Sequence, residues 1–289
     1  MNSILVLGGA GFVGRSLIKK LIENNFHVKA LIYKKDIKFN IEKFKGDILS
    51  PGILDSHIED GDIVVNLIGQ LTWSDATFSD LNIKGGLNLL ESCKRKKNVR
   101  IILISSINVY GENLKRPSKE SDSVRPKAIY GNIKLLTEKI YQNYSDVHGL
   151  DITVLRFSNL YGPGKKAGPI SNMIACLKNK KIFSAYNMGK QLRDFIFIED
   201  ATDGILAAIQ NPQTGFQVFN ISTGKRYMIK EVAKLIEKLS KGNLRMRLNK
   251  IIPDERCIWA NNSKAKRILK FSPKYSLEKG LKFTLNNQK

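Results

Sequence analysis

Short, continuous apolar runs alternate along the chain with segments of helical period. The first run, residues 4–7, breaks into glycines, and apolar residues then return at the spacing of one helical face, at Leu17, Ile18, Leu21 and Ile22. A continuous apolar run is typical of a strand buried on both faces of a parallel sheet. The repeated alternation of such strands with helices predicts an α/β fold and disfavours an all-α or all-β fold.

The same patterns predict the other elements of a doubly wound parallel sheet. Strands are expected over residues 28–33, 62–68, 100–104, 195–198 and 216–221, with one more ending at Asp47 and another at Arg156. Helices are expected over residues 78–96, 130–148 and 200–209, and further along over 229–239 and 263–269. No repeat or long linker interrupts this series.

Three glycines, Gly8, Gly11 and Gly14, follow the first strand at the spacing G-x-x-G-x-x-G. Gly8 allows a tight turn, Gly11 lets the backbone approach a pyrophosphate, and Gly14 lets the helix pack close to the strand. That helix begins near Phe12 and Val13, where unpaired N–H groups and the positive end of the dipole favour phosphates. Because the glycines lie between a strand pattern and a helix pattern, they predict a Rossmann dinucleotide site.

The end of the second strand bears on the choice of dinucleotide. Sheets that bind NAD usually hold an acid there, which takes the ribose hydroxyls. Here Ile32 occupies that place, followed by Tyr33, Lys34 and Lys35. Since cations fit a 2′-phosphate better than a free ribose, we expect NADP in preference to NAD, with Lys34 and Lys35 as its ligands. The alternative is that two lysines of a lysine-rich chain stand there by accident.

Three more residues are expected beside the cofactor. Asp47, with Ile48 next to it, is placed at the end of the third strand to accept from the adenine amino group. The alternative for Asp47 is a helix cap ahead of Pro51. Gly69 ends the fourth strand over the cofactor.

A serine, a tyrosine and a lysine form the candidate catalytic set. The strand over 100–104 opens into Ser105 and Ser106, and Tyr130 and Lys134 follow at the start of a helix. Their i, i+4 spacing puts the tyrosine and the lysine on one helical face. A free tyrosine, with a pKa of about 10, is a poor base at neutral pH. An ammonium one turn away, with the positive nicotinamide beside it, favours the phenolate and lowers that pKa.

Composition narrows the class of protein. The three cysteines, Cys93, Cys176 and Cys257, are far apart, which indicates a reducing compartment and no disulfide framework. The three histidines are equally scattered, so no metal site is expected. No signal peptide fits the first residues and no apolar run reaches membrane-spanning length, so we expect a soluble cytoplasmic protein.

The net charge of +22 allows a nucleic-acid or membrane partner. The lysines are nevertheless spread along the whole chain, and the one dense cluster, residues 94–97, falls at a predicted helix C-terminus, where cations are favoured. We therefore expect a solvated surface and no nucleic-acid partner, with a positive field that helps to capture a diphosphate substrate and cofactor.

Over nearly its whole length the chain resembles the extended short-chain dehydrogenases/reductases of the NAD-dependent epimerase/dehydratase (nucleotide-sugar) family. The motifs that carry the resemblance are Gly8–Gly14, Gly46-Asp47, Asn82 with Gly85 and Asn88–Glu91, Ser105–Gly111, Tyr130 with Lys134, Arg156–Pro163, Arg193–Phe195 with Glu199-Asp200, and Asn261–Lys266. The resemblance implies a catalytic triad of Ser106, Tyr130 and Lys134. In this family hydride passes between a sugar carbon and nicotinamide while the tyrosine moves the hydroxyl proton.

The resemblance also implies ligands for the nucleotide-sugar diphosphate at Asn159 and Arg193. A guanidinium matches phosphate oxygens bidentately, and Arg256 is a candidate second ligand, with a surface salt bridge as its alternative. Residues 1–162 are then assigned to the Rossmann domain, to which residues 195–225 return. Residues 163–194 and 226–289 are assigned to a smaller C-terminal α/β lobe that binds substrate.

Departures from the family pattern narrow the reaction. Dehydratases and decarboxylases of the family carry an acid one or two residues after the catalytic serine or threonine, where this chain has Ile107 and Asn108. The sequence therefore disfavours dehydration and decarboxylation. The glycine often found ahead of the substrate loop is also missing from residues 178–182, which bears on the nucleotide-base pocket.

The resulting hypothesis is an NAD(P)-dependent nucleotide-sugar epimerase that supplies activated sugars for surface polysaccharide. One alternative is an NADPH-dependent 4-ketoreductase, and another is a non-catalytic cofactor-binding scaffold or nucleic-acid-binding member of the fold. The family also implies a homodimer formed through the helices near residues 78–96 and 130–148.

Overall fold

The computed structural model describes residues 3–69, 76–251 and 257–287. A seven-stranded sheet, parallel throughout, has the strand order β11-β6-β5-β4-β1-β2-β3. Its strands are β1 (Ile4–Leu7), β2 (Val28–Ile32), β3 (Glu42–Lys45), β4 (Ile63–Asn66), β5 (Arg100–Ser106), β6 (Asp151–Phe157) and β11 (Phe216–Ile221). Every residue of β1 and β2 is buried, as expected for strands covered on both faces. All are apolar except Lys29 of β2, whose ammonium pairs with the buried Asp62 carboxylate at 3.0 Å.

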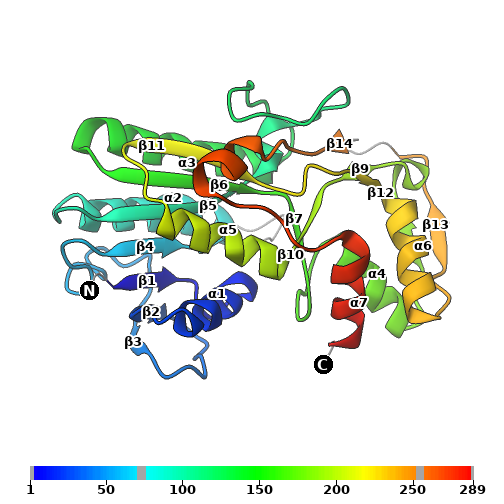
Figure 1. Cartoon of the computed structure of the whole chain (residues 1–289), viewed down its shortest axis with the longest axis horizontal. Coiled ribbons are helices and arrows are strands. Elements are labelled where there is room, and N and C mark those ends of the chain that lie inside the picture. Colours follow the sequence, from blue (N-terminus) through cyan, green and yellow to red (C-terminus); the bar gives the residue numbers. More distant parts are fainter. Residues whose placement is uncertain (1–2, 70–75, 252–256, 288–289) are drawn as a thin grey trace.

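Helices cover both faces of this sheet and confirm the predicted fold class. On the near face in Figure 1, α1 (Phe12–Glu23) and α5 (Ile198–Gln210) enclose a core with Leu17 and Ile205. On the far face, α2 (Ala76–Cys93) and α3 (Ile129–His148) pack side by side over a second core with Leu90 and Tyr141.

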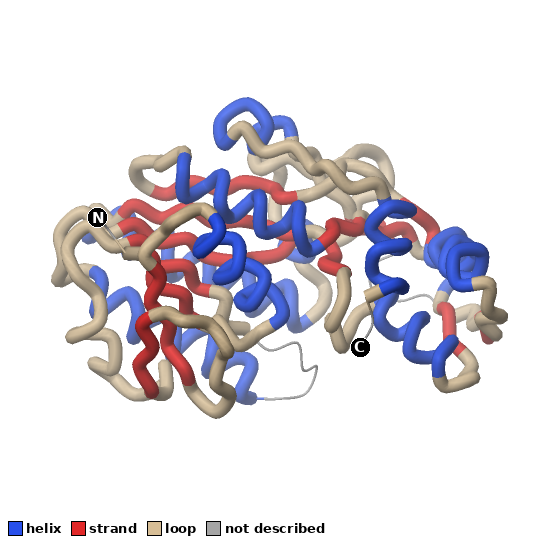
Figure 2. Tube along the Cα trace, turned by 60° about the horizontal axis from the view of Figure 1, so that its bottom comes forward, coloured by secondary structure: helices blue, strands red, loops and turns tan. Residues whose placement is uncertain are grey.

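A third core lies beyond the end of the sheet towards which the strands run (Figures 1 and 2). It is enclosed by α4 (Pro169–Lys178), α6 (Ile229–Ser240) and α7 (Leu277–Asn286). Three small sheets complete it: β7 (Asn159–Tyr161) with β10 (Phe195–Phe197), β8 (Phe183–Ala185) with β13 (Met246–Leu248), and β9 (Leu192–Arg193) between β12 (Tyr227–Met228) and β14 (Cys257–Ile258).

Two segments differ from their predicted places. The strand expected over 195–198 does not return to the main sheet, because β10 pairs with β7, which has already left the sheet after β6. The segment 265–271, assigned from the sequence to the substrate lobe, packs on the sheet instead, with Ala265, Leu269 and Phe271 in the core beneath α1 and α5. Both differences depend on long-range packing, which local periodicity does not record.

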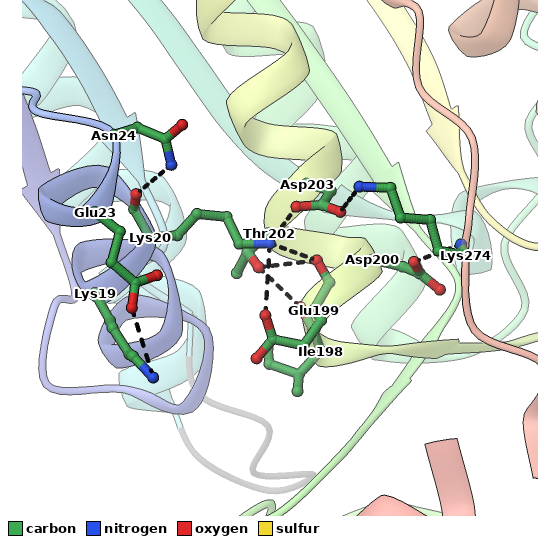
Figure 3. A network of polar contacts seen from close by, with 10 residues as sticks. All are labelled: Lys19, Lys20, Glu23, Asn24, Ile198, Glu199, Asp200, Thr202, Asp203 and Lys274. Atoms are coloured by element: carbon green, nitrogen blue, oxygen red, sulfur yellow. Dashed lines mark hydrogen bonds and ion pairs between the residues drawn. The ribbon is translucent and has the colours of Figure 1, made fainter. Parts of the chain in front are cut away.

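A network of charges joins α1 to α5 and to the segment before α7 (Figure 3). Lys20 on α1 donates to the Asp203 carboxylate and, at 3.1 Å, to the Glu199 carbonyl oxygen. Lys274 pairs with the other Asp203 oxygen at 3.0 Å, and its N–H donates to Asp200 at 2.7 Å. The network therefore fastens the C-terminal segment to the helices of the sheet.

Within residues 3–69, 76–251 and 257–287, no helix has both the length and the apolar character that crossing a membrane requires.

Candidate active site

The loop between β1 and α1 has no room for side chains at its glycines. Gly8 has a φ of +85°, and a Cβ on Gly14 would lie 2.4 Å from the Gly8 carbonyl oxygen. Gly11 caps α1 without a side-chain hydrogen bond, so the N–H groups of the first turn, beginning at Phe12 and Val13, have no side-chain acceptor at the cap. A bare helix N-terminus behind close-packed backbone fits the pyrophosphate of a dinucleotide.

On the first turns of α3, facing the carboxyl end of β5, Lys134 is buried and Tyr130 is half-buried. The Lys134 ammonium donates to the Asn82 side-chain oxygen at 2.9 Å and to the Ile104 carbonyl oxygen at 3.2 Å. Burial lowers the pKa of Lys134 to about 8, against the opposing charge of Glu138 one turn further on. The Tyr130 ring stacks on Phe78 of α2 with 5.5 Å between centroids.

The protein groups alone do not lower the pKa of Tyr130, so the expected lowering depends on the nicotinamide. Burial raises the pKa of Tyr130, and the hydrogen bond with Ser106 opposes this shift without overcoming it. The physical reason is that burial disfavours the charged phenolate. The Lys134 ammonium donates to Asn82 and to the carbonyl oxygen of Ile104. In the family reaction, the positive charge that favours the phenolate belongs in part to the nicotinamide.

The two serines at the end of β5 have different partners. Ser105 donates to Glu138, which also holds Arg156 through two of its guanidinium nitrogens. Ser106 instead accepts from the Asn108 N–H at 3.2 Å and begins the short helix η1 (Ile107–Tyr110). Ser105 is thus part of a buried ion-pair network, and Ser106 is the serine in contact with the tyrosine.

These groups surround a single cavity of about 340 Å³. Its lining includes Gly8, Gly11, Phe12, Val13, Gly14 and Gly69 on the dinucleotide side and Ser106, Tyr130, Lys134, Asn159 and Lys165 around the rest. The residues that line it in the described chain include no aspartate or glutamate. The cavity therefore combines a phosphate cradle, a proton-transfer pair and an excess of positive charge.

The family model for the NAD-dependent epimerase/dehydratase family matches residues 4–222. The chain belongs to this family. The nucleotide-sugar resemblance of its motifs is confirmed, and so is the enzyme class, the extended short-chain dehydrogenases/reductases.

Similar proteins match this chain over almost its full length. The chain is 29% identical to the uncharacterised UDP-glucose epimerase YtcB of Bacillus subtilis, covering 96% of this chain and 95% of that one. It superposes with a TM-score of 0.88 and 28% identity on UDP-glucose 4-epimerase of Thermotoga maritima with UDP-glucose, covering 99% and 98% of the two chains. UDP-glucuronic acid 4-epimerase of Bacillus cereus, in complex with UDP-glucuronic acid and NAD, gives a TM-score of 0.88, 27% identity and 98% coverage of both chains.

Other predicted residues of this family member lie outside the cavity lining. Lys34 and Lys35 are exposed just beyond β2, with the Lys34 ammonium 5.1 Å from the centre of the Tyr33 ring. Asp47 accepts from the Leu49 N–H at 3.0 Å within a series of turns, so it does not cap a helix as its alternative interpretation expects. The Ile48 carbonyl oxygen accepts from the Asn88 side chain at 2.8 Å.

Of the three predicted substrate ligands, one lines the cavity, one lies outside its lining, and one lies outside the described residues. The Asn159 side chain lines the cavity and donates to the Asp194 carbonyl oxygen at 3.0 Å. Arg193 lies on β9, outside the lining, and donates to the Leu192 carbonyl oxygen at 2.9 Å. Arg256 lies outside the described residues.

Sequence reasoning did not place Lys165 in the site. It lies in the loop of residues 162–168, which joins β7 to α4. The signal available in the sequence was a cationic pair inside the glycine-rich stretch Gly162–Gly168.

Proposed function

We propose that this enzyme is a nucleotide-sugar epimerase in which Tyr130 exchanges a proton with a sugar hydroxyl. The observation that carries the proposal is that Ser106, Tyr130 and Lys134 line the same cavity as the glycine cradle. A sugar held there has a proton-transfer group and a dinucleotide within one enclosed space. The full-length likeness to epimerases supports the same reaction.

Each residue has a role in the proposal. The first turn of α1 with Gly8, Gly11 and Gly14 would hold the cofactor pyrophosphate, and the bound nicotinamide would supply the hydride acceptor and donor. Tyr130 takes the hydroxyl proton, Ser106 holds the same oxygen, and Lys134 keeps positive charge beside the phenol. Asn159 and Arg193 bind the substrate, and Arg256 is proposed as a second phosphate ligand.

The cofactor is proposed to be NADP in preference to NAD, because Ile32 replaces the ribose-binding acid and two exposed lysines follow it. In this proposal Lys34 and Lys35 contact the 2′-phosphate and Asp47 and Ile48 border the adenine. The second candidate, NAD, is favoured by its presence in the B. cereus relative.

Net reduction of a 4-keto sugar is the second candidate reaction. It is favoured because Ile32 stands where NAD-binding sheets usually carry an acid, which favours a dissociable NADP. Dehydration and decarboxylation are disfavoured, since Ile107 and Asn108 stand where those enzymes carry an acid and no described lining residue is acidic. A homodimer through α2 and α3, a cytoplasmic location and a role in polysaccharide precursor synthesis complete the proposal.

The test is the Tyr130→Phe variant, assayed by NMR for the C4 epimers of UDP-glucose and UDP-glucuronic acid. Loss of the proton-transfer group should lower kcat by roughly 10²–10⁴-fold and leave dinucleotide affinity unchanged. Ser121→Ala, in a loop outside the cavity lining, is the control. Unchanged turnover in Tyr130→Phe would contradict the proposal, and steady NADPH consumption on a 4-keto sugar would favour the reductase.

A further inference from the structure

A buried carboxylate, Glu138, lies one turn beyond Lys134 on α3. Its side chain is buried, with an exposed fraction of 3%, and the i, i+4 spacing puts it on the helical face that carries Lys134. The Arg156 guanidinium donates to this carboxylate from Nε at 3.0 Å and from Nη2 at 2.6 Å. A bidentate pair of this kind offsets the cost of burying the two charges. The catalytic helix therefore carries a buried, paired anion to which the proposed reaction assigns no role.

The same carboxylate reaches the carboxyl end of β5. Ser105, which lines the active-site cavity, donates to Glu138. Arg156 of β6 stands directly opposite Ser105 in the register of the two strands, and both side chains meet the carboxylate on the face that α3 covers. Glu138 thus joins α3 to β5 and β6 at the residue before Ser106.

Few groups set the charge around Lys134. Its ammonium contacts the neutral Asn82 side chain of α2 and the Ile104 carbonyl oxygen of β5. Of the charged groups in the described part of the chain, Glu138 is the one that shifts the pKa of Lys134, and it opposes the lowering caused by burial. The phenol of Tyr130, on the same helical face, is the other titratable group beside the lysine in the cavity wall.

Arg156 limits how far the anion neutralises the lysine. Alone, Glu138 would cancel the charge of Lys134, and none would be left to favour the Tyr130 phenolate. With Arg156 present, the three buried side chains carry one net positive charge, which a phenolate on Tyr130 would balance. The arrangement keeps the lysine charged and leaves that charge available to the tyrosine.

We propose that Glu138 is a positioning residue of the catalytic set, which keeps Lys134 protonated and ties the serine end of β5 to α3, with Arg156 as its counter-charge. The inference rests on the proposed function, to which it adds a residue that acts through Lys134 and Ser105. It predicts opposite effects on Lys134 for two substitutions that break the same ion pair, which a purely structural role does not.

The test is an NMR titration of the free protein labelled with ¹³C at lysine, in which the Lys134 signal is identified by its loss in Lys134→Arg. In wild type the ε-carbon of Lys134 should titrate near pH 8. In Glu138→Gln, which keeps an oxygen for Ser105, the midpoint should fall by about one pH unit, because the anion is gone and Arg156 repels the ammonium. In Arg156→Met it should rise by about as much, because Glu138 then acts on Lys134 without its counter-charge.

Turnover of UDP-glucose or UDP-glucuronic acid, with the dinucleotide saturating, gives the second readout. The alkaline limb of the kcat profile should follow the NMR midpoint, moving to lower pH in Glu138→Gln and to higher pH in Arg156→Met. Glu91→Gln is the control, because this half-buried carboxylate of α2 also accepts from α3, through Tyr144, but lies outside the cavity lining. It should leave both the midpoint and the limb unchanged.

Midpoints that move in the same direction in both variants, or that stay at the wild-type value, would overturn the inference, and so would a kcat limb that ignores the midpoint. If a single variant does not fold, Glu138→Gln/Arg156→Met carries the test, since it leaves Lys134 without either charged neighbour. Its midpoint should lie below that of wild type, and an unchanged value would exclude the role of Glu138. The titration needs no substrate, so a protein that shows these shifts but forms no epimer would refute only the proposed reaction.

Discussion

The neighbouring residues Ser105 and Ser106 show how finely the site depends on single positions. Successive side chains of a strand point to opposite sides, so one hydroxyl reaches the buried Glu138–Arg156 pair and the next reaches the tyrosine. The family resemblance indicated Ser106, and this serine is the one in contact with Tyr130. The partners of Lys134 were not predictable, because Asn82 is 52 residues away along the chain.

The cofactor preference is tested at the same scale. Wild type should bind NADPH roughly tenfold more tightly than NADH if Lys34 and Lys35 form charge-assisted contacts with a 2′-phosphate. A Lys34→Ala/Lys35→Ala double variant should lose that preference and keep its NADH affinity, as fluorescence titration would show.

Lys38→Ala, which removes another exposed lysine of the same loop, is the control. Tighter binding of NADH than of NADPH by wild type would refute the assignment of both lysines.

Among the elements, apolar runs predicted the strands of the main sheet other than β3, which is polar and mostly exposed, and apolar residues at helical spacing predicted the helices between them. Such runs are visible locally because a strand buried on both faces needs an apolar residue at every position. The pairing of β10 with β7, and the packing of Ala265 and Leu269 on the sheet, depend instead on contacts between segments far apart in the sequence. No local pattern carries that information.

The contact between α1 and α5 predicts a pH dependence of stability. Burial raises the pKa of Asp203, but hydrogen bonds from Lys20 and Lys274 outweigh it and hold the pKa below its ordinary value. A depressed carboxyl pKa stabilises the folded state above the unfolded pKa, and this contribution is lost as the pH falls through the folded value. Asp203→Asn should therefore lower the free energy of unfolding by roughly 1–2 kcal/mol at pH 7 and by much less near pH 3.

Denaturant unfolding at the two pH values measures this difference. Glu23→Gln is the matched control, because its pair with Lys19 is exposed on both sides and spans 3.7 Å (Figure 3). A deficit in Asp203→Asn that stays constant from pH 7 to pH 3 would contradict the expectation.

On the scale of the whole molecule, three exposed apolar side chains lie along one side of α3. Ile129, Leu136 and Val147 have exposed fractions of 67%, 49% and 65%, and their separations of 7 and 11 residues place them on one side of the helix. An apolar stripe of this kind on a surface helix is typical of an interface. It supports the proposed homodimer, which the sequence suggested only through the family.

A Leu136→Asp/Val147→Asp variant should be monomeric at concentrations where wild type is dimeric, because two buried carboxylates would oppose association. Light scattering after size-exclusion chromatography gives the masses. Ile251→Asp, equally exposed but in the segment after β13, should leave the mass unchanged. A monomeric wild type would refute the dimer.

The chain crosses repeatedly between the sheet and the third core. It leaves the sheet after β6, returns at α5, leaves again after β11, and packs on the sheet once more at Ala265–Leu269 before ending in α7. Neither part is therefore a continuous stretch of polypeptide, and a gene truncated between them would encode two incomplete hydrophobic cores. Proteolytic cleavage of a single connection would not release a separately folded fragment. The main sheet with its helices and the third core should unfold together in one calorimetric transition.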